Sequence, residues 1–168
     1  YGALAGAGAV VNNTITHAVT AAFGINSRVT ARDILATATN TVNKPQLGQA
    51  NIVGSTDGLA SGAAAHSSTV LDITTRVDVG SNADLITVAR AGTAGAIRLA
   101  ANNIINAYDK VSLTTGGALS GAGAFSSIET RNFVAQVNIG ANATLFTLGI
   151  LTLSANGGGN AYSVSNSE

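Results

Sequence analysis

Apolar residues recur along the chain in short runs that either alternate with polar residues or continue over four to six positions. These runs are rich in Val, Ile, Leu and Thr and are bounded by Gly, Asn or Ser, a pattern that predicts β-strands. The clearest examples are RVTA, DILATA, VDV, ADLITV, VNI, TLFTL and ILTLS. We therefore expect an all-β chain.

One segment, residues 97–108, has a helical spacing of apolar residues instead. The residues concerned are Ile97, Ala101, Ile104, Ile105 and Tyr108. A similar segment at 153–162 carries three consecutive glycines at 157–159, and each would cost a helix interior about 1 kcal/mol relative to Ala. We therefore predict β-structure in both segments, with a turn at the glycines.

The chain repeats its own pattern three times, in units of about 54 to 60 residues. Units of this length, 2–57, 58–116 and 117–168, are too short to be independent domains and should stack into one domain, 1–168. Three sets of segments carry the repeat: GALAGAGAVVNN, GLASGAAAHSS and GALSGAGAFSS; FGINSRV, VGSNADL and IGANATL; LAANNIINAY and LSANGGGNAY.

Short strands, short connections and a long-period repeat predict a parallel β-helix. With about 20 residues in each coil, the chain would form about eight coils. The alternative is an antiparallel sandwich with a strand every 8–12 residues. A sandwich would explain the strand lengths but gives no reason for the triplication.

Comparing residues 76–88 with 136–148 separates positions that should face the core from positions that should face solvent. The apolar pairs predicted to face the core are Val77 and Val137, Val79 and Ile139, Leu85 and Leu145, and Val88 and Leu148. The pairs predicted to face solvent, because charge is lost between repeats, are Arg76 and Gln136, Asp78 and Asn138, and Asp84 and Thr144.

A Gly-x-Asn motif persists in all three repeats while the charges around it change. Gly and Asn both tolerate positive φ, and Asn can hydrogen-bond nearby backbone, so the motif predicts a tight turn. In a stacked fold the amides can also bond from one repeat to the next. The predicted turn residues are Gly24, Asn26, Gly80, Asn82, Gly140 and Asn142.

Composition and charge argue against several classes of partner. Charged residues make up 10% of the chain and the net charge is +0, with the basic residues scattered. Nucleic acid or an anionic membrane surface would require a basic patch. The chain has no Cys for disulfides or thiolate metal sites, and no apolar run approaches the roughly 18 residues of a transmembrane segment.

The run GAGAVVNNTITHAV followed by FGINSRVTARDILATA resembles the recurring block of large bacterial exoproteins of the filamentous-haemagglutinin type. In that family, stretches similar to V-N-x-I, G-x-x-V-T-A and D-I-x-x-x-A recur along a right-handed β-helical shaft. The second and third repeats carry serines near the position of Asn12. The resemblance implies a secreted or surface-exposed adhesin or matrix fibre.

Few residues suggest chemistry. Asp72, Asp78 and Asp84 are evenly spaced, which would suit a glycan-cleaving β-helix with a paired acid and base. The third repeat replaces all three, so solvent-exposed charge is the favoured interpretation. The only histidines are His17 and His66, and His66 aligns with Val10 and Phe125, which predicts a core or coil-edge position and not a metal ligand.

We therefore expect no catalytic, cofactor or metal site. The predicted function is a structural or adhesive shaft of an extracellular bacterial surface adhesin or self-associating fibre. A glycan-binding or glycan-cleaving β-helix is the alternative. Because neither end has a polar cap, the expected partners are copies associating end to end or laterally, or further coils of a longer chain, with carbohydrate or a host surface as additional candidates.

Overall fold

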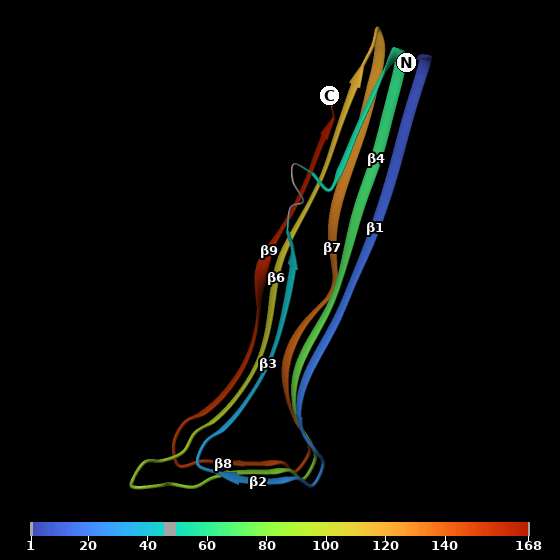
Figure 1. The fold of residues 1–168 in the computed structure, drawn as a ribbon. Helices are drawn as coiled ribbons and strands as arrows, with labels where there is room; N and C mark the ends of the chain where they lie inside the picture. Colours follow the sequence, from blue (N-terminus) through green and yellow to red (C-terminus); the bar gives the residue numbers. More distant parts are fainter. Residues whose placement is uncertain (1, 46–49, 168) are drawn as a thin grey trace.

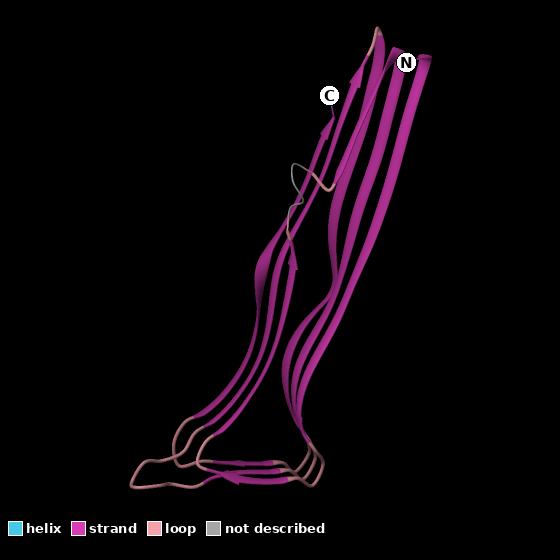
Figure 2. Cartoon of the chain, in the orientation of Figure 1, coloured by secondary structure: helices cyan, strands magenta, loops and turns pink. Residues whose placement is uncertain are grey.

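Nine β-strands make up most of the molecule, and the described part of the chain contains no helix (Figure 1, Figure 2). The computed structural model describes residues 2–45 and 50–167. The strands are β1 (Gly2–Phe23), β2 (Arg28–Ala31), β3 (Ile34–Lys44), β4 (Ile52–Val79), β5 (Asp84–Thr87), β6 (Ile97–Gly116), β7 (Leu119–Ile139), β8 (Thr144–Phe146) and β9 (Leu151–Ser167).

Each repeat contributes a long strand, a short strand and a second long strand. Equivalent strands of successive repeats pair in parallel, as in the ladders that begin with Gly2 beside Gly58 and Ala60 beside Leu119. We call the β1, β4 and β7 ladder sheet A, the β2, β5 and β8 ladder sheet B, and the β3, β6 and β9 ladder sheet C. Every ladder between these strands is parallel, so the antiparallel sandwich alternative is wrong.

Sheets A and C run side by side along the molecule, and sheet B crosses between them at one end (Figure 1). Toward the opposite end the chain passes from sheet C back to sheet A. The first residues of β4, 52–57, pair with 111–116 of β6 and so belong to sheet C before the strand crosses to sheet A. One repeat later, β6 ends at Gly116 and β7 begins at Leu119.

Gly117 makes the second of these crossings possible. Its φ is 147°, a conformation that residues other than glycine rarely adopt. A Cβ added there would also collide with the carbonyl oxygen of Gly58 in the repeat before. The passage from sheet C to sheet A therefore requires glycine at this position.

The prediction of about eight coils is wrong. Paired residues lie between 54 and 63 positions apart, not about 20, so each repeat passes once through the three sheets. The reason is strand length. The Gly, Ser and Asn positions that suggested frequent turns lie inside strands of up to 28 residues, as in β4, because small and polar residues also suit the outward-facing positions of a strand.

The core lies between sheets A and C, is closed at one end by sheet B, and is best sealed in the second repeat. Val77, Val79 and Leu85 are buried, as predicted. Their third-repeat equivalents are less covered because no further strand pairs beyond β7 and β8 in the described chain, and Ile139 is 41% exposed.

Val88 and Leu148 do not face the core, so that prediction is wrong. Val88 is 47% exposed and Leu148 is 69% exposed. Side chains alternate between the two faces of a strand, and Leu85 and Thr87 are the inward residues at the end of β5. Val88 comes one residue after Thr87 and therefore points to the opposite, outer face. In the third repeat, β8 ends before Leu148.

Segments 97–108 and 153–162 are strands, which confirms the preference for β-structure over helix. The predicted turn at 157–159 is wrong, because β9 continues through the glycines. A Cβ added at Gly157 would lie 2.6 Å from Cε1 of Phe133. Glycine at this position therefore makes room for the ring in the third repeat.

The expected single domain, 1–168, and its three repeat units include a few residues that lie outside the described ranges. These are residue 1, residues 46–49 and Glu168.

Candidate functional site

Three Gly-x-Asn turns stack where sheet A meets sheet B. In each turn the backbone N–H three residues after the glycine donates to the glycine carbonyl over 3.2 Å, as from Ser27 to Gly24. The φ angles of Asn26, Asn82 and Asn142 are 56°, 56° and 57°. Asn tolerates this left-handed conformation better than most residues, which explains its use at the third position of the motif.

The three asparagine side chains form a ladder with one direction. Asn82 Nδ2 donates to Asn26 Oδ1 over 3.1 Å, and Asn142 Nδ2 donates to Asn82 Oδ1 over 3.3 Å. Each repeat therefore donates to the repeat before it. The structure brings these predicted turn residues together in one column.

The glycines of the motif have a different role from the one predicted, because none of the three has positive φ. A Cβ added at Gly80 would lie 2.6 Å from the carbonyl carbon of Gly24, and one at Gly140 would lie 2.7 Å from that of Gly80. The same addition at Gly24 meets nothing within 4 Å. Close backbone stacking therefore excludes a side chain at the second and third turns.

The three evenly spaced carboxylates do not converge. Asp72 and Asp78 lie on the outer face of β4, and six residues of strand separate them by about 20 Å at a rise of about 3.3 Å per residue. Each accepts a hydrogen bond from the third repeat, from Asn132 over 3.1 Å and from Asn138 over 2.6 Å. Asp84 lies on another sheet, beside Arg28 in the β2 to β5 register.

The two histidines also lie apart. His66 is exposed on the outer face of sheet A and packs edge-on against Phe125, with ring centroids 4.8 Å apart. It therefore does not point into the core. His17 Nδ1 lies 3.3 Å from Asn40 Oδ1. Within residues 2–45 and 50–167, no group of three or more His, Cys, Asp or Glu side chains could hold a metal ion.

A buried carboxylate between sheets A and C was not singled out from the sequence. Asp109 is fully buried and accepts hydrogen bonds from Lys44 Nζ over 2.8 Å, Ser67 Oγ over 2.9 Å and Ser126 Oγ over 3.0 Å. The sequence feature that could have revealed its burial is the alternation along β6, because the residues two positions to either side of Asp109 are apolar and face inward. These contacts use both carboxylate oxygens and make Asp109 a bridge between the sheets.

A second polar group crosses the core nearer to sheet B. Asn103 is buried, donates through Nδ2 to the Val134 carbonyl over 2.7 Å and accepts from Thr75 Oγ1. Because an unpaired polar group in a protein interior is costly, these two bonds are what allow Asn103 to occupy the core.

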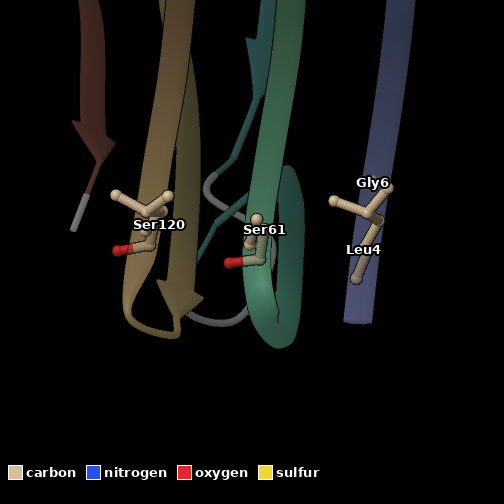
Figure 3. Close-up of a pocket in the computed structure, with 7 residues that line it drawn as sticks. Leu4, Gly6, Ser61 and Ser120 are labelled. Atoms are coloured by element: carbon tan, nitrogen blue, oxygen red, sulfur yellow. The ribbon is translucent and has the colours of Figure 1, made fainter. Parts of the chain in front are cut away.

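A hollow lies at the far end of sheet A from the turns (Figure 3). No charged residue and no histidine lines it, so it offers no acid, base or metal ligand. Its lining consists of Leu4, Ala5, Gly6, Ala60, Ser61, Leu119 and Ser120.

No helix long and apolar enough to span a membrane occurs in the described ranges. Compared with protein-family models, with curated proteins and with solved structures, the chain matches none. The functional proposal rests on the stacked turns and the parallel ladders.

Proposed function

We propose that this chain is a structural and adhesive shaft segment of an extracellular bacterial surface adhesin or self-associating fibre, and that it carries out no catalysis. In this proposal the three parallel sheets are the wall of a right-handed β-solenoid with one coil per repeat. The shaft would be extended by stacking further coils or further copies.

The observation that supports the proposal is the in-register pairing of whole repeats. Successive repeats pair along β1 and β4, and again along β4 and β7, over most of the length of these strands. Repeated units that contact only their neighbours form extended scaffolds whose length is set by the number of units. The resemblance of GAGAVVNNTITHAV to the shaft blocks of large exoproteins supports the same proposal.

No observation favours the glycan-cleaving alternative. Paired catalytic carboxyl groups in glycosidases lie within about 10 Å of each other, whereas Asp72 and Asp78 are about 20 Å apart by the strand rise. The substitution Asp78→Asn should leave any sugar-cleaving activity of the purified chain unchanged. A loss of such activity would favour the enzyme.

Immunogold electron microscopy of the cells that produce the protein tests the proposal. Antibodies raised against the purified chain should label fibres or the outer surface of intact cells. Label confined to the interior of sectioned cells would contradict the proposal. Preimmune serum provides the matched control.

A further inference from the structure

We propose that two copies of this chain join head to tail, with β7, β8 and β9 of one copy pairing with β1, β2 and β3 of the next. We call the β7, β8 and β9 side the trailing edge and the β1, β2 and β3 side the leading edge. This inference rests on the proposed function and names the partner surface that would extend the shaft.

The two edges are complementary in their side-chain amides. Each Asn amide of the turn column donates to the preceding repeat. The leading edge therefore presents Asn26 Nδ2 as a donor, and the trailing edge presents Asn142 Oδ1 as an acceptor. A head-to-tail joint would continue the column.

The backbone of the same turns is complementary as well. Gly80 N–H donates to the Phe23 carbonyl over 2.8 Å, and Gly140 N–H donates to the Val79 carbonyl over 2.7 Å. By the same rule, Gly24 N–H of one copy would donate to the Ile139 carbonyl of the copy before it. The joint would thus add backbone bonds of the kind already made twice within the chain.

Within residues 2–45 and 50–167, no neighbouring atom requires a glycine at Gly24. Its equivalents Gly80 and Gly140 are excluded from carrying Cβ by the backbone of the preceding repeat, whereas a Cβ at Gly24 meets nothing within 4 Å. A trailing edge of another copy, placed as the preceding repeat, would supply the backbone that makes glycine necessary there.

The core is open at the trailing edge. Leu151 and Leu153 are each 47% exposed, whereas the paired residues Ile97 and Leu99 of the second repeat are 0% exposed. A leading edge placed on them would cover this apolar surface in the way that β9 covers β6. Burial of apolar surface is the main favourable term in such association.

The polarity of the amide column favours a head-to-tail joint over a symmetric dimer through these edges. Joining two leading edges by a two-fold axis would pair the strands antiparallel, unlike every strand ladder within the chain, and would leave the Asn26 donors without the Asn142 acceptors. A heterologous joint leaves one edge of each kind free and so continues into open filaments. Filaments of increasing length are therefore expected as the protein concentration rises.

Sedimentation velocity of the purified 168-residue chain over a wide range of concentration tests the joint. The wild-type sedimentation coefficient should rise with concentration, whereas Gly24→Ala should remain monomeric throughout, with an unchanged circular dichroism spectrum. Gly123→Ala is the matched control and should associate like wild type, because Gly123 also has open space around it and the aligned β4 residue is Ala64. A wild-type chain that stays monomeric, or a Gly24→Ala variant that associates like wild type, would overturn the proposal.

Disulfide trapping tests the register independently, since the chain has no Cys. Val10 and Phe125 both pair with His66, so the joint would place Phe125 of one copy beside Val10 of the next. Mixing Val10→Cys with Phe125→Cys should give a disulfide-linked dimer that neither variant gives alone. Dimers of Val10→Cys with itself would overturn the head-to-tail arrangement.

The failure of this inference and the failure of the proposed function give different results. A chain that stays monomeric in solution but whose antibodies label surface fibres would overturn only the joint. Labelling confined to the cell interior, with association intact, would overturn only the proposed function.

Discussion

Lys44 Nζ lies 2.8 Å from Oδ1 of Asp109, and the carboxylate side chain of this pair is fully shielded from solvent. Lys44 lies on β3 of the first repeat and Asp109 on β6 of the second. The pair therefore ties two repeats together within the layer that also joins sheets A and C.

Removing this carboxylate should destabilise the fold strongly. Asp109→Ala would remove the carboxylate that accepts from Lys44, Ser67 and Ser126 and would leave Lys44 with only the Tyr108 carbonyl at 3.3 Å, and breaking a buried ion pair costs about 3–5 kcal/mol. Urea unfolding of the monomer measures the change. Glu129→Ala is the control, because the Glu129 to Arg131 pair is exposed and such pairs contribute little. Equal effects of the two substitutions would contradict the structural role of Asp109.

Gly80→Ala should destabilise the monomer, whereas Gly24→Ala should not. The added methyl group at Gly80 would lie 2.6 Å from the Gly24 carbonyl carbon, and such overpacking costs about 1–3 kcal/mol. Gly24→Ala should change the free energy of unfolding by no more than about 1 kcal/mol. Chemical denaturation at a concentration where the chain is monomeric compares the two, and an equal loss in both variants would contradict the stacking geometry.

Asn82→Ala should lower the melting temperature more than Asn82→Gly. Both substitutions remove the side-chain hydrogen bonds to Asn26 and Asn142, but only Ala carries a further cost of about 1–2 kcal/mol in the left-handed conformation. For a chain of this size, each kcal/mol corresponds to about 2–4 °C. Thermal unfolding followed by circular dichroism measures the difference. Unchanged melting of Asn82→Ala would refute the role of the turn.

Thr75→Val should destabilise the chain through Asn103. The substitution keeps the shape of the side chain but removes the hydroxyl that donates to Asn103 Oδ1, and an unsatisfied buried acceptor costs about 1–3 kcal/mol. Thr74→Val, on the neighbouring outward-facing position of β4, is the control. Equilibrium denaturation should show a loss for Thr75→Val that clearly exceeds the loss for Thr74→Val.

Register was the most predictable property of the fold. The alignment of His66 with Val10 and Phe125, made from the repeated sequence alone, is the pairing observed in sheet A. Local pattern succeeds here because parallel, in-register pairing places equivalent residues of successive repeats side by side. The same pattern placed Gly80 and Asn82 in corresponding turns without revealing that stacking, and not φ, demands the glycine.

The burial of a charged residue such as Asp109 depends on which side chains of the opposite sheet face it. Asp109 is a charged residue in an alternating strand, and only the approach of Ser67 and Ser126 from sheet A, with Lys44 beside it, makes its burial favourable. The sequence by itself determined the preference for β-strands, through local alternation, and the repeat and register, through the similarity of its three repeats. The tertiary structure alone decided that each repeat passes once through the sheets, because strand length and the sealing of the core depend on packing between sheets A and C.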